Sequence, residues 1–184
     1  IIPFPTPKVF VGADSSLTLS REIIKSGIKR LTLITSAGMY KRGEVDLILR
    51  TLRSGGVKVD VFHQVEPDPG YETIQAGVKR LRETNAQAVF AVGGGSSIDG
   101  AKTMVACYAN DCHPSKLIGL FKVRKMGVPF YAAPTTAGTG SEVTVAAVVT
   151  DKVARQKHAI IDPKLVPSMV ALDPKLMVGL PPDI

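Results

Sequence analysis

The sequence predicts an α/β fold: a Rossmann-like, doubly wound and mostly parallel sheet with a β-hairpin near the C-terminus. Three observations support this prediction. Short apolar runs alternate with stretches of helical periodicity, some of these runs are apolar throughout, and three glycines follow one of them directly. Strands that are apolar along their length are typical of parallel sheets covered on both faces, and the alternation is that of βαβ units. We expect the whole chain, residues 1–184, to form one such domain.

Four strands and three helices are expected before residue 135. The strands are short runs rich in apolar and β-branched residues, at 30–35, 57–62, 88–92 and 128–134. Apolar residues at helical spacing predict the helices, around Val45–Leu52, around Ile74–Leu81 and from Ser96 to about Ala109. In a doubly wound sheet the carboxyl ends of the strands meet at one edge, where ligands bind. This topology brings together four loops, 36–43, 66–70, 93–97 and 135–141.

After residue 141 the pattern changes from alternating strands and helices to strands alone. The segments VTVAAVVT (143–150) and KHAIID (157–162) predict a hairpin about a polar turn near Asp151–Arg155. A further short strand is expected within 167–174. The final stretch, LMVGLPPDI, ends in prolines, and no further element is expected there.

Composition and charge narrow the class of protein. The formal net charge of +7 favours anionic partners, but the basic residues are scattered and only 5% of residues are aromatic, which argues against nucleic acid. A phosphate-bearing small molecule explains the charge equally well. No apolar run approaches the roughly 20 residues of a membrane span, no signal peptide is visible, and Cys107 and Cys112 lack metal-type spacing. We expect a cytoplasmic protein with reduced thiols and no membrane partner.

The run AVFAVGGGSSIDGAKTMVA (88–106) places three glycines between a buried strand and a helix. A glycine has no Cβ, so the backbone turns tightly there and approaches a ligand closely. The first N–H groups of the helix have no partner within it, and a pyrophosphate accepts hydrogen bonds from them. Asp99 is expected in the first turn, capping N–H groups or bonding a cofactor hydroxyl, and Lys102 shares its face. The alternative is a structural turn before a capped helix, since the GxGxxG spacing is absent.

A second loop, APTTAGTGSEVT (133–144), combines hydroxyl groups with exposed glycine backbone. Such a loop suits hydrogen bonds to a phosphate, a ribose or a carboxamide, although a polar turn without a ligand has the same composition. Because both loops fall on one edge of the expected sheet, we favour binding. The hydroxyl-bearing residues of this loop are Thr135, Thr136, Thr139, Ser141 and Thr144.

Three motifs in order, GGGSSIDGAK, PTTAGTGSEVT and KHAIIDPKLVPSMVALDPKLM, resemble the iron-containing (group III) alcohol dehydrogenases, and the resemblance extends from PTPKVFVG to GLPPDI. It implies an NAD(P)-dependent oxidoreductase whose N-terminal α/β domain binds the dinucleotide, while an all-helical C-terminal domain supplies the ligands of iron or zinc. This chain then corresponds to the cofactor-binding domain of an enzyme that transfers a hydride between nicotinamide and a metal-bound alcohol or aldehyde. The helical domain is missing from it, so the chain alone should be inactive.

The resemblance also implies roles for individual residues. Asp99 should lie near the nicotinamide end, and Asp68, in EPDP, matches a position near the adenosine half. Lys157 matches a lysine that contacts the cofactor ribose. The hydroxyl-bearing residues of the second loop should line the cofactor site. The expected pyrophosphate contacts come from Gly94, Gly95 and Ser96.

One departure from the family pattern concerns the choice between NAD and NADP. Many NAD-preferring members carry an aspartate after the strand that reads LITSAGMYKRG here, whereas this chain has Ser36. The repulsion between such a carboxylate and a 2′-phosphate is then absent. Since Lys41 and Arg42 follow shortly, we predict tolerance of, or preference for, NADP(H). The alternative is that both basic residues simply face water.

The second departure concerns the metal. The family's ligands are an aspartate and histidines of the helical domain, and this chain stops before that domain. Its own histidines, His63, His113 and His158, are far apart, and none has a partner at the i+3 or i+4 spacing of helix-borne ligands. We therefore expect neither a metal ligand nor a catalytic residue in this chain.

Two other functions fit part of the sequence. One is a stand-alone, non-catalytic nucleotide-binding module that is complete at this length. The other is a fragment of a polyol dehydrogenase or a dehydroquinate-synthase-like lyase, which share a similar domain and often use zinc. The motif TTAGTGSEVT favours the iron-containing alcohol dehydrogenases over both alternatives. These residues do not indicate the substrate. An exposed strand is expected near the N-terminus, and its pairing between subunits would give a homo-oligomer.

Overall fold

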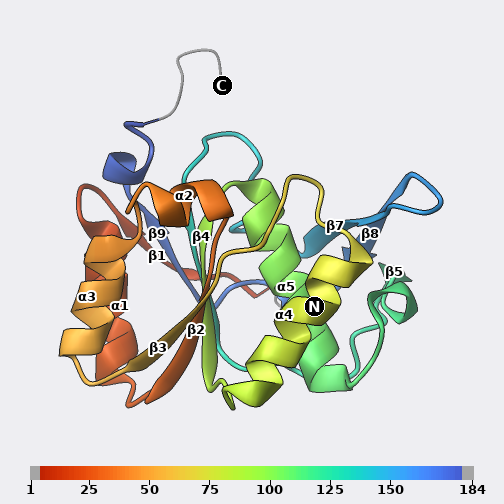
Figure 1. Ribbon diagram of the computed structural model, residues 1–184, viewed down its shortest axis with the longest axis horizontal. Coiled ribbons are helices and arrows are strands. Elements are labelled where there is room, and N and C mark those ends of the chain that lie inside the picture. The colour runs from red at the N-terminus through yellow and green to blue at the C-terminus, as the bar shows by residue number, and fades with distance from the viewer. Residues whose placement is uncertain (1–4, 180–184) are drawn as a thin grey trace.

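A computed structural model describes residues 5–179, which form a parallel sheet between two layers of helices, with a small second sheet at its side (Figure 1). The large sheet consists of β1 (Lys8–Val11), β2 (Arg30–Ile34), β3 (Lys58–Phe62), β4 (Ala88–Gly93), β6 (Phe130–Pro134) and β9 (Met169–Leu172). The helices are α1 (Ser15–Lys25), α2 (Ala37–Lys41), α3 (Asp46–Ser54), α4 (Tyr71–Glu83) and α5 (Gly95–Asn110). The small sheet holds β5 (Gly119–Leu120), β7 (Ala146–Asp151) and β8 (Gln156–Ile161), and short 3₁₀ turns occur at Pro114–Lys116, Pro163–Leu165 and Pro174–Leu176.

The six strands of the large sheet run in the order β1-β9-β6-β4-β2-β3, and every neighbouring pair is parallel. This confirms the expected α/β, Rossmann-like fold. From β2 the chain first adds β3 on one side and then returns to add β4 on the other side. The strand order therefore reverses between β2 and β4, and this reversal marks the place at the carboxyl ends where ligands of such sheets bind.

Strand β4 shows why its sequence is apolar throughout. Val89 and Ala91 belong to the apolar core beneath α4 and α5, whereas Phe90 and Val92 belong to the core beneath α1 and α3. Residues 88–92 are all fully buried. Alternate side chains of one central strand thus fill two separate cores, as expected of a parallel sheet covered on both faces.

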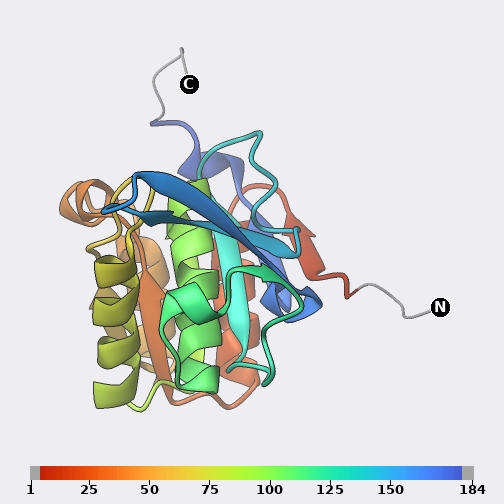
Figure 2. The ribbon, with the colours of Figure 1, turned by 90° about the vertical axis from the view of Figure 1, so that its right-hand side faces the viewer.

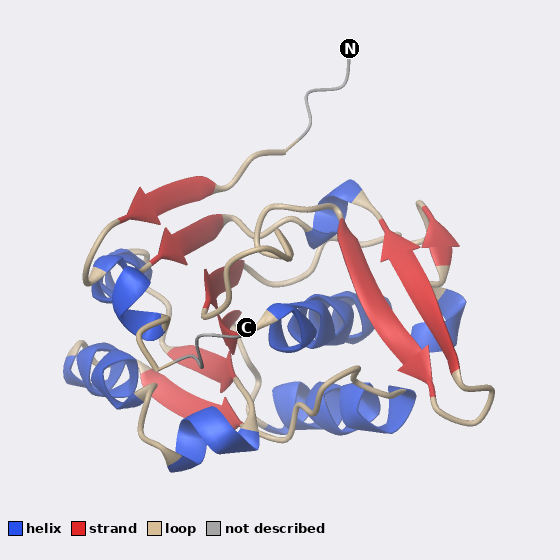
Figure 3. Cartoon of the chain, turned by 90° about the horizontal axis from the view of Figure 1, so that it is seen from above, coloured by secondary structure: helices blue, strands red, loops and turns tan. Residues whose placement is uncertain are grey.

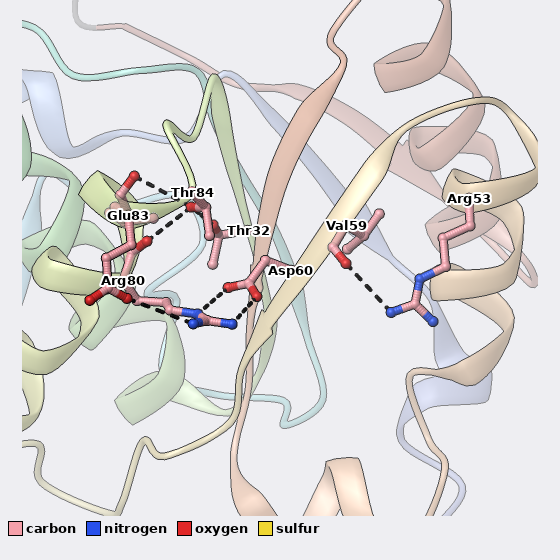
Figure 4. A network of polar contacts seen from close by, with 8 residues as sticks. Thr32, Arg53, Val59, Asp60, Arg80, Glu83 and Thr84 are labelled. Atoms are coloured by element: carbon pink, nitrogen blue, oxygen red, sulfur yellow. Dashed lines mark hydrogen bonds and ion pairs between the residues drawn. The ribbon is translucent and has the colours of Figure 1, made fainter.

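Polar contacts fasten α4 to the sheet it covers (Figure 4). The guanidinium of Arg80 donates to the carboxylate of Asp60 on β3, with an Nε–Oδ2 distance of 2.8 Å. One turn further along, the Thr84 hydroxyl donates to the Arg80 carbonyl oxygen at 2.9 Å and lies 3.5 Å from the Thr32 hydroxyl of β2. These contacts fix the end of α4 that leads into β4.

The small sheet lies across α5 and is dominated by the antiparallel β7–β8 hairpin, as Figures 2 and 3 show from two directions. Its register runs from Ala146 opposite Ile161 to Asp151 opposite Gln156. The Thr150 N–H donates to the Pro69 carbonyl oxygen at 3.0 Å, which ties the hairpin to the loop after β3. The hairpin therefore brings a late part of the chain next to the carboxyl edge of the large sheet.

Several boundaries differ from the sequence-based expectation. The strand expected at 128–134 begins at Phe130, and the first hairpin strand is 146–151 rather than 143–150, because residues 141–143 form a turn. The strand expected within 167–174 is Met169–Leu172. The expected absence of structure in the final stretch falls partly on residues 180–184, which lie outside the described residues.

The sequence pattern does not predict α1, α2 or β5, and it indicates only an exposed strand near the N-terminus. In the structure this strand is β1, which pairs in parallel with β9 of the same chain and forms one edge of the sheet. Helix α1 shows no clear apolar periodicity, because its buried face combines Leu19 and Ile23 with small polar residues such as Ser16 and Ser20. None of the described helices has the length and apolar character that crossing a bilayer requires.

Candidate functional site

The carboxyl ends of β2, β4 and β6 bring three of the expected loops together at the reversal of strand order. Ser36 follows β2, the three glycines end β4 and begin α5, and Thr135 follows β6. The Thr135 N–H donates to the Gly93 carbonyl oxygen at 3.1 Å, so the glycine loop and the threonine-rich loop are in direct contact. The arrangement follows from the parallel pairing of β4 with β6, in which Gly93 lies opposite Pro134.

The glycines allow the two loops to approach one another closely. A Cβ on Gly95 would lie only 2.9 Å from the Thr139 Cγ2 and 3.2 Å from the Ser141 hydroxyl oxygen. Helix α5 starts at Gly95, its N-cap residue Gly94 has no side chain to cap it, and no acidic residue stands in its first turn. The positive end of a 16-residue helix therefore lies at this edge of the sheet without a compensating side chain from its own first turn.

Asp99 lies beyond the first turn of α5, so the expectation that it stands in that turn is wrong. Its Oδ2 accepts the Val148 N–H at 3.0 Å, while its buried Oδ1 has no hydrogen-bond partner within residues 5–179. Burial raises the pKa of this carboxyl, and the bond from Val148, the charge of Lys102 and the Ser141 hydroxyl oppose that rise. One oxygen of this carboxylate is therefore buried without a hydrogen-bond partner in the described part of the chain.

The threonine-rich loop offers a second unpaired group. The Thr136 hydroxyl is buried and, among the residues described, finds no hydrogen-bond partner. Thr135 and Ser141 are buried as well, and the Thr139 hydroxyl accepts the Ser141 N–H at 3.3 Å. Thr144 is different, because both its hydroxyl and its carbonyl oxygen contact the ammonium of Lys102.

Three of the expected residues meet where the loop after β3 reaches α5. The Asp68 N–H donates to the Ser96 hydroxyl at 3.2 Å, and the Asp68 carboxylate pairs with the Lys157 ammonium of β8 at 2.7 Å. Both members of this ion pair are more than half exposed. The pair therefore joins the hairpin to the edge of the sheet while it stays accessible to solvent.

The residues after β2 are only partly as expected. Ser36 serves as the N-cap of α2, where its hydroxyl accepts the Met39 N–H at 3.4 Å. Arg42 forms an ion pair with Glu44, whereas no carboxylate in the described part of the chain pairs with Lys41. Half of the expected basic pair is therefore already neutralised.

Sequence reasoning missed two features beside these loops. The ring of Tyr40 stacks on that of His63 with centroids 4.5 Å apart and an interplanar angle of 4°. Glu66 joins the hairpin to the loop after β3, since it accepts from Thr73 at 2.7 Å and from Lys152 at 2.6 Å. The residue types alone gave no signal, because both features depend on tertiary contacts between separate elements.

Within residues 5–179 no group of three His, Cys, Asp or Glu side chains is placed to hold a metal ion. A dinucleotide, by contrast, fits what is present. An uncapped helix terminus suits its phosphates, and the free oxygens of Asp99 and Thr136 suit its polar groups.

Comparison with known proteins gives an independent indication of the family. Residues 5–174 match the family model described as iron-containing alcohol dehydrogenase. The chain is 33% identical over 178 residues to the NAD-dependent methanol dehydrogenase of Bacillus methanolicus, an alignment that covers 97% of the chain and 47% of that enzyme. It is also 34% identical to the bifunctional aldehyde-alcohol dehydrogenase AdhE of Escherichia coli K12, covering 89% of the chain and 20% of that protein.

Solved structures agree with these relatives. A 1,3-propanediol oxidoreductase superimposes with a TM-score of 0.92 at 30% identity over 98% of the chain and 48% of that protein. A sulfoacetaldehyde reductase from Bifidobacterium kashiwanohense, solved in complex with NAD+, gives 0.88 at 26% identity, over all of the chain and 49% of that enzyme. The chain spans about half the length of the first of these curated relatives and of both structures. The chain belongs to the iron-containing alcohol dehydrogenase family and corresponds to its N-terminal half.

Proposed function

We propose that this chain is the cofactor-binding domain of an NAD(P)-dependent alcohol dehydrogenase or aldehyde reductase. The observation that carries the proposal is the uncapped N-terminus of α5, in contact with a loop of threonines at the reversal of strand order. In this proposal residues 1–184 bind the dinucleotide, and an all-helical part outside these residues supplies the ligands of iron or zinc. The bound dinucleotide supplies the hydride acceptor or donor of the reaction.

The pyrophosphate is assigned to the start of α5. Its oxygens accept hydrogen bonds from the backbone N–H groups of Gly95 and Ser96, and the positive helix end favours their charge. Gly94 and Gly95 carry no Cβ, so the phosphates reach the backbone. Since Thr139 and Ser141 lie against Gly95, the second loop forms the opposite wall of this phosphate site.

The two free oxygens orient the remainder of the cofactor. Asp99 Oδ1 accepts a donor from the nicotinamide end, and the Thr136 hydroxyl donates to a phosphate or a ribose oxygen. The adenosine side is assigned to Asp68, whose N–H donates to the Ser96 hydroxyl, and to its ion-pair partner Lys157. The two side chains exchange their mutual ion pair for contacts with the ribose. Thr135 positions the second loop, because its N–H donates to the Gly93 carbonyl oxygen. Thr144 acts through its contact with Lys102.

The choice of cofactor is assigned to the residues after β2. Ser36 brings no negative charge to the expected position of the ribose 2′-group, and Lys41 has no carboxylate partner in the described part of the chain. We therefore propose that the protein accepts NADP(H) at least as well as NAD(H), with Lys41 rather than Arg42 near the 2′-phosphate. The reaction is placed in the cytoplasm, where thiols such as Cys107 and Cys112 stay reduced.

The test is a fluorescence titration of the full-length protein with NADH and NADPH, comparing Gly95→Ala with Gly100→Ala. Alanine at position 95 meets Thr139 at 2.9 Å and displaces the second loop, so the dissociation constant should rise about tenfold, which is about 1.4 kcal/mol. Gly100 is the matched control, because it lies in the same helix and its added Cβ meets Val65 at an ordinary 3.4 Å.

Three outcomes count against parts of the proposal. A wild-type protein that binds neither dinucleotide overturns the assignment of a cofactor domain. Equal losses in Gly95→Ala and Gly100→Ala overturn the placement of the phosphates at the start of α5. Binding of NADH about tenfold tighter than NADPH overturns the proposed tolerance of NADP(H).

A further inference from the structure

Lys102 is a charged side chain in the interior of the protein, on the face of α5 that the hairpin covers. It is only 1% exposed, among the most deeply buried large side chains of the described residues. Its ammonium donates to the Thr144 carbonyl oxygen at 2.7 Å and to the Ala146 carbonyl oxygen at 2.8 Å, and lies 3.3 Å from the Thr144 hydroxyl. A buried ammonium is expensive unless such acceptors surround it.

Asp99 lies one helical turn before Lys102 in α5 and bonds the same segment of the hairpin. Its Oδ2 accepts the Val148 N–H at 3.0 Å, so the two side chains bind the backbone at 144, 146 and 148. Residues three apart on a helix share a face, and this face of α5 is covered by β7. The pair therefore sets where the chain leaves the second loop and enters the hairpin.

Stability alone does not explain such a pair. A buried ammonium contributes little net stability compared with an apolar side chain of the same volume, because the charge loses its hydration. Most other buried positions of α5 are apolar or small, including Ile98, Ala101 and Val105, and Lys102 is the one charged residue among the buried positions of this helix. An apolar side chain at position 102 would not provide a positive charge near Asp99, whose Oδ2 accepts the Val148 N–H and whose Oδ1 has no partner among residues 5–179.

The electrostatics around the pair support this reading. Burial raises the pKa of Asp99, and the charge of Lys102 opposes that rise. Burial lowers the pKa of Lys102 to about 8, against the charges of Asp99 and Glu142, so the ammonium is protonated at neutral pH. The other groups that face Asp99 are the Val148 N–H and the Ser141 hydroxyl, which are neutral.

We propose that Lys102 is a positioning residue of the dinucleotide site: it holds the 144–148 segment on α5 and places a positive charge one helical turn from Asp99, whose Oδ1 has no partner among residues 5–179 and is left for the cofactor. The inference rests on the proposed function above. It adds that cofactor binding depends on a charge that does not itself touch the ligand.

The experiment compares Lys102→Met with wild type and with Lys79→Met, an exposed lysine of α4, in the full-length protein. Dissociation constants for NADH are measured between about pH 5 and pH 7, where Lys102 is mostly charged in the wild type. Without the ammonium, Asp99 takes up a proton at a higher pH. Binding of NADH by Lys102→Met should therefore weaken relative to wild type as the pH falls, and the acid limb of its pH profile should lie at a higher pH than that of wild type.

Hydrogen exchange supplies the readout that does not depend on the cofactor. The amides of residues 144–148 should exchange faster in Lys102→Met, while those of β4 keep their protection because the central strand is untouched. Should Lys102→Met fail to fold, Lys102→Gln replaces it. Its amide still donates to a carbonyl oxygen but carries no charge, so the acid limb should move in the same way.

The outcomes separate the two proposals. A wild-type protein that binds no dinucleotide removes the proposed function and this inference with it. A wild-type protein that binds NADH, alongside a folded Lys102→Met or Lys102→Gln with unchanged affinity and an unchanged pH profile, overturns the inference about Lys102 alone. A uniform loss of affinity without movement of the acid limb overturns its electrostatic part.

Discussion

Replacing Glu66 by glutamine should destabilise the protein at neutral pH, and the loss should become smaller as the pH falls. Burial by itself raises the pKa of Glu66. Hydrogen bonds from Lys152, from Thr73 and from the backbone outweigh burial and lower the pKa to about 2, from an ordinary 4.5. The folded state therefore holds this carboxylate in its ionised form more strongly than the unfolded chain does.

The size of the effect follows from that pKa. A decrease of the pKa from 4.5 to about 2 corresponds to about 3 kcal/mol of stability for a side chain that is fully shielded from solvent. The Glu66 side chain is 30% exposed and its partner Lys152 is 50% exposed, so solvent reduces the contribution to about 1–2 kcal/mol. Because the folded pKa is depressed, this stability is present above about pH 4.5 and disappears as the pH falls towards about 2.

Urea unfolding of wild type and Glu66→Gln at about pH 7 and about pH 3 measures this directly. Glu83→Gln is the control, since that carboxylate is 49% exposed and its ion pairs lie on the helix surface, where such pairs contribute little. The reasoning is refuted if Glu66→Gln is as stable as wild type near neutral pH. It is equally refuted if the loss stays the same in acid.

Two further predictions concern the packing around α5. Gly77→Ala in α4 places a Cβ 2.3 Å from the Met104 sulfur, so the free energy of unfolding should fall by about 1 kcal/mol despite the higher helix propensity of alanine; a Tm above that of wild type contradicts this. Cys112 should react with a thiol reagent in the native protein, whereas Cys107 is fully buried and burial raises its pKa, so it should react only on unfolding. Equal native rates for the two thiols would argue against the burial of Cys107.

The sequence predicted the central sheet well because local pattern and tertiary role coincide there. In β4 each side chain from Ala88 to Val92 is buried, so hydrophobicity alone marks the strand. The meeting of the loops followed from a topological rule: parallel strands with right-handed crossovers bring their carboxyl ends to one edge. The predicted proximity of the glycine and threonine loops is confirmed, and the Thr135 N–H donates to the Gly93 carbonyl oxygen.

Elements whose pattern and role diverge could not be predicted in this way. The buried face of α1 includes Ser16, which bonds the buried carboxylate of Asp173 across 157 residues. That partner is invisible in a local window of sequence. The same holds for the pairing of Asp68 with Lys157 and for the burial of Lys102, because each depends on where the hairpin returns to the sheet.

In the proposed function, the backbone at the start of α5 receives the phosphates of a dinucleotide. Amide NMR of the isotopically labelled protein, titrated with NADH, tests it residue by residue. We predict that the N–H resonances of Gly95 and Ser96 move furthest, while that of Gly100, further along the same helix, moves little. Saturable binding that shifts other amides and leaves those of Gly95 and Ser96 in place would contradict the account.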